Sequence, residues 1–202
     1  MNIERDFLEG KKSALTKLQK AQNEKKVDKG ILPILNIINA SDDYYTSSSC
    51  YGRIVLLEIP NIGDKKAAKF LGKWHRTIDV NELLDASKKA RYGQIWLLSQ
   101  SPIIHINTKT NEAADRLLKT AIACGFKNSG IKSLGRKIVV EVCSTERFDA
   151  PVGKDGVLFC NNEHLELLTD ISNEILKKST QKLKKFEKNL GKVLSTHKTT
   201  NN

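Results

Sequence analysis

The links between apolar segments in the middle of this chain are too short for a doubly wound parallel sheet. Between residues 53 and 143, segments with strand and helix patterns follow one another in the order strand, helix, strand, strand, once from Phe70 and once from Ile103. Parallel strands need crossovers of about a dozen residues or more, whereas antiparallel strands join through tight turns. The spacing therefore predicts an α+β fold with a mostly antiparallel, barrel-like sheet, and not a Rossmann fold.

Turn and cap residues set the bounds of these elements. Asp79 is suited to begin a helix as its N-cap, and Gly125 is suited to end one. A glycine at position 135 indicates a hairpin. The expected strands are 53–58, 70–76, 94–99, 103–107, 131–134 and 137–143, and the expected helices are 80–91 and one that begins at Thr110 or Asn111.

Both ends of the chain are expected to be helical. Phe7–Lys26 and the residues after Asn162 carry apolar side chains at helical spacing with lysines between them. The long C-terminal helix is expected to fold back onto its own domain, with a coiled-coil arm or partner helix as the alternative. We predict a single domain over 1–196, comprising N-terminal helices in 1–40, the sheet in 41–160 and the C-terminal helix in 162–196, followed by a flexible tail at 197–202.

The positive charge is concentrated at the two ends. The net charge is +11, and residues 1–30 and 170–202 contribute eight of these excess charges. Such a surface attracts polyanions and suits RNA phosphates or an acidic membrane surface. The alternative is that the lysines only keep the helices soluble.

The sequence favours a cytoplasmic protein without a metal. No apolar run approaches the ~20 residues that span a bilayer, and no signal peptide precedes the charged N-terminus. The four cysteines are scattered, without the close pairs of a structural zinc site, and we expect most of them to be small core residues. The sequence has no H-x-x-x-H pattern, and we do not expect its H-x-E match at His164–Glu166 to bind a metal.

Phosphate-binding motifs of the common nucleotide folds are missing. The chain contains neither G-x-G nor the P-loop pattern. Gly153–Gly156 matches the G-x-x-G loop of KH domains, but it joins two strand-like segments, and Asp-Gly readily forms a hairpin turn. We therefore expect a hairpin at this position.

The most unusual stretch is Asp42–Arg53, which reads DDYYTSSSCYGR. Its hydroxyl groups and the fork-shaped guanidinium of Arg53 suit a carboxylate or phosphate, and its tyrosines could stack on a base. A serine-rich surface turn that leads into a strand is the alternative interpretation.

Further polar candidates lie at the ends of predicted elements. Asn128 and Ser129 follow a helix, and Ser144 and Thr145 follow a strand. His75 and His105 are placed within strands of one sheet, which raises the odds of acid–base chemistry. Each histidine alone is more often a structural, hydrogen-bonded residue.

These stretches, in order, resemble the family of wybutosine-synthesis methyltransferases. The matching blocks are D-x-[YF]-[YF]-T-[ST]-S-x-C-x-G-R-I at Asp42–Ile54, Trp74–His75, Pro102–His105, G-F-[RK]-N-S-G at Gly125–Gly130, Ser144–Thr145, and the D-A-P and G-V-L segments that begin at Asp149 and Gly156. In relatives we expect an arginine before the S-T pair, where this chain has Cys143, which puts one substrate or cofactor contact in question.

The resemblance implies an enzyme of tRNA modification that uses S-adenosyl-L-methionine as its methyl donor. The acceptor would be nitrogen-4 of the tricyclic modified guanine beside the anticodon of tRNA-Phe, as in the tRNA-Phe 7-aminocarboxypropyl-demethylwyosine nitrogen-4 methyltransferases. Its anticodon stem-loop would be the partner, and the particular intermediate and the oligomeric state stay open.

Roles for individual residues follow as expectations. We expect His75 or His105 to accept a proton. Donor binding is assigned to Ser47, Ser48, Ser49, Arg53, Asn128 and Ser129, and substrate binding to Tyr45, Cys50, Trp74, Ser144 and Thr145. Two other classes compete with the enzyme: a non-catalytic basic tRNA- or RNA-binding module, and an interaction scaffold built on the C-terminal helix. Binding of the methyl donor separates the enzyme from the RNA-binding module, and the scaffold predicts a stable partner or dimer instead of tRNA binding.

Overall fold

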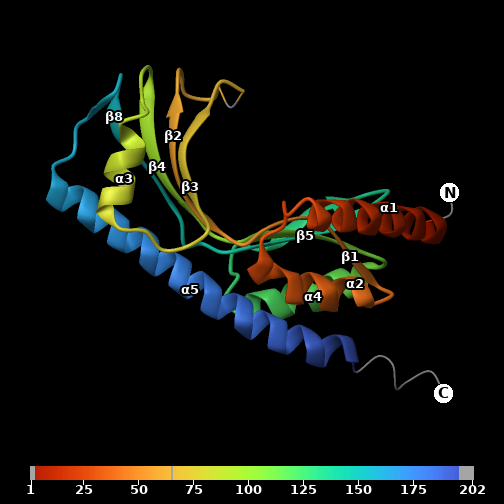
Figure 1. The fold of residues 1–202 in the computed structure, drawn as a ribbon. Coiled ribbons are helices and arrows are strands. Elements are labelled where there is room, and N and C mark those ends of the chain that lie inside the picture. Colours follow the sequence, from red (N-terminus) through yellow and green to blue (C-terminus); the bar gives the residue numbers. More distant parts are fainter. Residues whose placement is uncertain (1–2, 65, 196–202) are drawn as a thin grey trace. The chain divides into compact units, whose positions relative to one another are not determined.

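A computed structural model describes residues 3–64 and 66–195, and their contacts divide the chain into two compact units (Figure 1). Unit 1 comprises residues 1–51, 102–145 and 180–202, and unit 2 comprises residues 52–101 and 146–179. Each unit is an antiparallel sheet with helices. The tail 197–202 lies outside the described residues. No helix in the described part has the length and apolar character of a membrane span.

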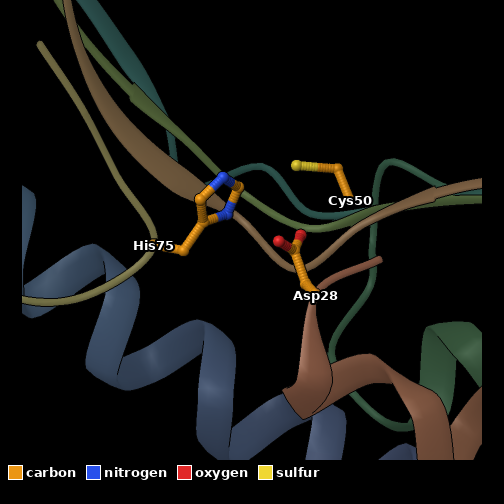
Figure 2. A group of neighbouring side chains, drawn as sticks. All are labelled: Asp28, Cys50 and His75. Carbon is orange, nitrogen blue, oxygen red and sulfur yellow. The ribbon is translucent and has the colours of Figure 1, made fainter. Parts of the chain in front are cut away.

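Unit 1 contains a four-stranded sheet of order β1-β5-β7-β6, in which all neighbours are antiparallel. Asp28 secures the end of β1, because its Oδ2 accepts the N–H of Tyr51 at 3.0 Å and its carboxylate lies within 4.8 Å of Cys50 Sγ (Figure 2). The strands are β1 (Tyr44–Cys50), β5 (Ile103–Thr108), β6 (Gly130–Leu134) and β7 (Ile138–Cys143), and the helices are α1 (Ile3–Asn23), the 3-10 turn η1 (Lys29–Ile31), α2 (Leu32–Ala40) and α4 (Asn111–Ala123).

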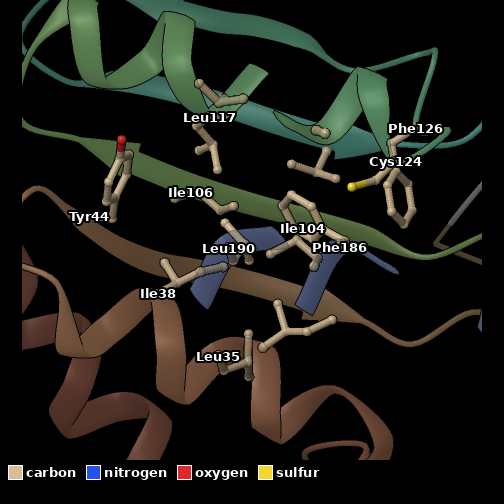
Figure 3. Packing of buried hydrophobic residues seen from close by; sticks show 14 of the residues in the cluster. Leu35, Ile38, Tyr44, Ile104, Ile106, Leu117, Cys124, Phe126, Phe186 and Leu190 are labelled. Atoms are coloured by element: carbon tan, nitrogen blue, oxygen red, sulfur yellow. The ribbon is translucent and has the colours of Figure 1, made fainter. Parts of the chain in front are cut away.

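One face of this sheet builds the core of unit 1. Ile104 and Ile106 alternate with outward-facing residues along β5 and pack against helix residues such as Leu35, Leu117 and Phe186 (Figure 3). These helix residues come from α2, α4 and the C-terminal part of α5 (Asn162–Ser195). Helix α1 lies on the opposite side of the sheet from α2 and α4 (Figure 1).

Gly10 allows α1 to lie close to β1. A Cβ at this position would stand 2.5 Å from Tyr45 Oη, so no larger residue fits without a shift. Phe7, one turn earlier, packs edge-on against the ring of Tyr45 with centroids 5.1 Å apart. Gly10 lowers the helix propensity of α1 but permits this close packing.

Unit 2 contains a five-stranded antiparallel sheet of order β3-β2-β4-β8-β9. Its apolar face packs against α3 and the first half of α5, through residues such as Ile54, Leu97, Leu83 and Leu165. The elements are β2 (Arg53–Ile59), β3 (Lys69–Trp74), α3 (Val80–Ser87), β4 (Gln94–Gln100), β8 (Phe148–Lys154) and β9 (Val157–Leu158).

The α+β class with antiparallel strands is confirmed, and most predicted elements are found. Asp79 caps α3 in a capping box with Glu82, and Thr110 rather than Asn111 caps α4. Gly153–Gly156 forms the expected hairpin, where Asp155 and Gly156 have φ of 50° and 79°. The strands form two sheets rather than one, and the single domain over 1–196 stays a prediction.

Four local expectations were wrong. The hydroxyl-rich stretch is not a turn or loop but strand β1, because its backbone pairs with β5 along its length. His75 follows β3 instead of lying within it, so the two histidines do not share a sheet. The helix predicted over 80–91 ends at Ser87. Among the cysteines only Cys124 is buried, while the other three are half-buried.

Candidate functional site

Three polar side chains form a hydrogen-bonded row across the sheet of unit 1. Ser48, His105 and Glu141 are register partners on β1, β5 and β7. Ser48 Oγ lies 2.8 Å from His105 Nδ1, and His105 Nε2 lies 2.9 Å from Glu141 Oε2. The row ends on β6, where Lys132 Nζ lies 2.8 Å from Glu141 Oε1. The sheet thus aligns a hydroxyl, an imidazole, a carboxylate and an ammonium.

Strand alternation explains why this row faces away from the core. Ile104 and Val140 are fully buried on the core face, and successive strand residues point to opposite faces. His105 and Glu141 therefore lie on the other face, with side chains 30% and 13% exposed. A bulge between Thr46 and Ser48 shifts the register of β1 and brings Ser48 opposite His105.

The electrostatics of the row favour an ionised Glu141. Burial raises the pKa of this carboxyl, but the hydrogen bond and charge of Lys132, together with His105, outweigh burial and hold the pKa below its usual value. The hydrogen bond to Glu141 raises the pKa of Lys132. A carboxylate accepts the Nε2 proton of a neutral imidazole, which leaves Nδ1 as an acceptor for the Ser48 hydroxyl. This is the arrangement of a polarised proton acceptor.

A groove of about 450 Å³ runs between α1 and the outer face of the sheet. One wall is β1 with Ser47, Ser48 and Ser49, and the other is α1, while Lys17 and Lys137 add positive charge. The volume lies in the range of small-molecule sites, about 300–1,000 Å³. The predicted serine cluster therefore borders a real depression, and Ser48 belongs both to the groove and to the polar row.

Asn128 and Ser129 lie in the loop after α4, at the Cys143 end of β7. Ser129 Oγ donates to the Phe126 carbonyl at 2.7 Å and accepts the N–H of Cys143 at 3.1 Å. The N–H of Asn128 donates to the Cys143 carbonyl at 3.2 Å, and the Asn128 side chain is exposed. The only O–H group of Ser129 donates to a backbone carbonyl. We therefore assign Ser129 to positioning the loop rather than to contacting the methyl donor.

Cys143 connects this loop to the hydroxyl-rich strand. Cys143 and Cys50 both pair with Ile103 of β5, so they lie in one row across the sheet. Two strand spacings amount to about 10 Å. The backbone of Cys143 holds the loop whatever its side chain is, although we expected an arginine here in relatives.

Two predicted substrate contacts are covered by protein. Tyr45 is 2% exposed and packs against Phe7, so stacking a base on its ring would require α1 to move. Ser144 is fully buried, and its Oγ accepts a hydrogen bond from Lys182 Nζ at 2.9 Å. Thr145, the next residue, is exposed.

The remaining predicted residues belong to unit 2. Arg53 Nε donates to Gln100 Oε1 at 2.7 Å, and its guanidinium lies 5.7 Å from the centre of the Phe70 ring. Trp74 packs on the core of unit 2, over Gly72. The exposed His75 has its Nδ1 3.1 Å from the Gly52 carbonyl (Figure 2).

Sequence reasoning missed Glu141 and Lys132. Glu141 is the one acidic residue in the otherwise apolar strand IVVEVC, and this charge in an apolar strand could have marked it as a candidate functional residue. Its partners could not be read from the sequence, because they depend on the register of three strands.

Comparison with known proteins identifies the family. The family model described as "Methyltransferase TYW3" matches residues 9–192. A relative from Pyrococcus furiosus is 44% identical over 191 residues, covering 94% of this chain and 97% of that protein. It is named tRNA(Phe) 7-((3-amino-3-carboxypropyl)-4-demethylwyosine(37)-N(4))-methyltransferase 1. A relative with the same name, without the final number, from Methanocaldococcus jannaschii is 41% identical over 93% of this chain and 98% of its own length.

Solved structures agree with this assignment. A protein from Pyrococcus horikoshii superposes with a TM-score of 0.90 at 43% identity, covering 94% of this chain and 98% of that one. A protein from Aeropyrum pernix superposes with a TM-score of 0.72 at 27% identity, covering 83% and 99%. The resemblance inferred from the sequence motifs and the expected enzyme class are confirmed. The chain belongs to the Methyltransferase TYW3 family.

Proposed function

We propose that this chain methylates nitrogen-4 of a 4-demethylwyosine-type base in tRNA(Phe), with S-adenosyl-L-methionine as methyl donor. The names of its relatives support the substrate, since identity of 41–44% extends over more than nine-tenths of the chain. A methyltransferase family favours the enzyme over a non-catalytic RNA-binding module. The cytoplasm is the proposed location because the substrate is a tRNA.

The groove beside β1 suits the methyl donor. A methionine-derived donor has a carboxylate and ribose hydroxyls, and the groove offers hydroxyl groups from Ser47, Ser48 and Ser49 together with Lys137. These residues would hold it, and the exposed Asn128 is retained as a proposed contact to the donor. The donor contact expected of Arg53, which belongs to unit 2, stays a prediction. When bound, the donor supplies an electrophilic methyl group on a sulfonium.

The polar row supplies the base for the acceptor nitrogen, and this observation carries the proposal. As nitrogen-4 bonds to the methyl carbon, the carbon–sulfur bond breaks and the N–H proton must leave. Ser48 Oγ accepts that proton as its own hydroxyl proton passes to His105 Nδ1, 2.8 Å away. Glu141 holds Nε2 of the same ring and stabilises the imidazolium that forms. His105 is the proposed base because its ring joins the Ser48 hydroxyl and the Glu141 carboxylate in one hydrogen-bonded row.

A methylation assay with His105→Ala tests the proposal. Wild type and variant are incubated with isotopically labelled donor and tRNA(Phe) that lacks the nitrogen-4 methyl group. Loss of a general base is expected to lower kcat by about 10²–10⁴-fold. His164→Ala is the matched control, because His164 is exposed on the first turn of α5 and should leave kcat unchanged.

Two outcomes would contradict the proposal. If the wild type does not bind the donor and does not transfer a methyl group to tRNA, the chain is a binding module. If His105→Ala retains full kcat, the polar row is structural and the base must be sought elsewhere.

A further inference from the structure

The face of the unit 2 sheet turned away from its helices carries an unusual combination of side chains. Ile95 and Leu97 of β4 pack into the core with α3 and α5, so Trp96 and Leu98 point to the opposite face. Strand register places Phe70, Leu57, Trp96 and Pro151 in one row across four strands of this face. In unit 2, α3 and α5 both lie on the other side of the sheet (Figure 1).

Basic and amide groups surround this apolar row. Lys73 lies in the next row, with its Nζ 5.8 Å from the centre of the Phe70 ring. Arg53 and Gln100 form the row beyond, and the Arg53 guanidinium lies 5.7 Å from the same ring. At the far side of Trp96, its Nε1 donates to Gln94 Oε1 at 3.0 Å. Phe70 therefore lies within 6 Å of two cations.

The exposure of these residues distinguishes the face from a core. Phe70, an aromatic residue on the edge strand β3, is 53% exposed. Trp96 and Leu57 are half-buried. The acidic residue of this face, Asp149, is paired with Arg147 at 2.7 Å, so it does not cancel the charge of Arg53 and Lys73. An exposed aromatic row with flanking cations is complementary to a polyanion that has flat apolar groups.

We propose that this face, from Phe70 to Trp96, is a stacking surface for unpaired bases of an RNA loop. The proposal rests on the proposed function, which supplies an RNA substrate, and adds a second contact region with its own residues. Bases of single-stranded loops stack on aromatic side chains exposed on sheets, while cations at the rim contact phosphates. The side-chain amides of Gln94, beside Trp96, and of Gln100, beside Arg53, could form hydrogen bonds with the edges of stacked bases.

Substitution of Phe70 tests the surface directly. Affinity for a fluorescently labelled anticodon stem-loop RNA is measured by anisotropy for the wild type, Phe70→Leu and Phe70→Tyr. Because stacking on one aromatic ring contributes about 1–3 kcal/mol, Phe70→Leu should weaken binding by about 5- to 150-fold, and Phe70→Tyr should restore it. Phe159→Ala, another exposed aromatic of unit 2 at 73%, is the control and should bind normally.

A second variant measures the electrostatic part. Lys73→Gln should lower affinity for all RNA sequences and reduce the slope of log affinity against log salt by about 0.7–0.9, the value for one phosphate contact. Phe70→Leu should leave this slope unchanged, because it removes no charge.

The outcomes separate this inference from the proposed function. If the wild type methylates tRNA but Phe70→Leu binds RNA normally, or Phe70→Tyr is as weak as Phe70→Leu, the stacking surface is overturned and the enzyme stands. If Phe70→Leu weakens RNA binding in a protein without methyltransferase activity, the surface stands and the proposed function fails. A loss of self-association in Phe70→Leu with normal RNA affinity would identify a protein interface and also overturn the inference.

Discussion

At the scale of single residues, Glu141 is the side chain whose environment matters most. It lies between valines in β7, where alternation directs it out of the core toward His105 and Lys132. Both partners stabilise its charged form, and this is why its pKa is lowered although it is only 13% exposed. A carboxyl with a lowered pKa in the folded protein links stability to pH.

Replacing this carboxyl should change how stability depends on acid. The folded-state pKa of Glu141 lies below 4.5, so the folded protein binds its proton less readily than the unfolded chain does. The stabilisation is complete above the unfolded value and is lost as pH falls through the folded pKa. The free energy of unfolding should therefore fall more steeply below about pH 5 for the wild type than for Glu141→Gln, as measured by urea unfolding at several pH values. Parallel curves would show that the pair with Lys132 contributes no net stability.

At the scale of elements, the loop from 125 to 130 shows how a functional motif can be mainly structural. Gly125 adopts φ of +100° after the last turn of α4, which a residue with a side chain rarely does. Ser129 then joins the loop to β7 through Phe126 and Cys143. The motif G-F-K-N-S-G is thus a helix end and a strand contact, with Asn128 exposed on it.

Ser129→Ala tests this structural role. The variant removes the acceptor of the Cys143 N–H and one of the two donors to the Phe126 carbonyl, which keeps the backbone N–H of residue 129. It should lower the free energy of unfolding by about 1–3 kcal/mol. Ser133→Ala on exposed β6 is the control and should stay within about 0.5 kcal/mol of the wild type. Thermal and urea unfolding measure both. Unchanged stability with weaker donor binding would return Ser129 to the donor contacts first expected from the sequence.

At the scale of the whole molecule, α5 serves both units. Leu165 and Leu176 pack in the core of unit 2, and Phe186 and Leu190 pack in the core of unit 1. The prediction that this helix folds back onto its own chain is confirmed. The scaffold interpretation required the apolar face of α5 to bind a partner, and core packing occupies that face instead. Truncation after Ile171 would remove core residues of both units, so it cannot isolate an RNA-binding role.

Exposed lysines of α5 offer a cleaner test of charge. Lys184 and Lys188 are exposed, and lysines near a tRNA release counterions when they contact phosphates. Lys184→Gln with Lys188→Gln should weaken tRNA binding and reduce its salt slope by up to about 1.4–1.8, measured by filter retention at several salt concentrations. The double arginine variant retains the charge and should bind like the wild type. An unchanged slope in the glutamine variant would mean that α5 does not contact the tRNA.

Local patterns in the sequence determined the presence of the helices, the cap at Asp79, the hairpin at Asp155–Gly156 and the family, and they narrowed the cap of α4 to Thr110 or Asn111. These features depend on side chains a few residues apart, so the sequence displays them directly. Only the tertiary structure decided which distant side chains meet. Strand register joined Glu141 to His105, α1 buried Tyr45, and Arg53 and Ser47–Ser49 became parts of two different sheets. Register and burial arise from packing between segments far apart in the chain, and no local pattern encodes them.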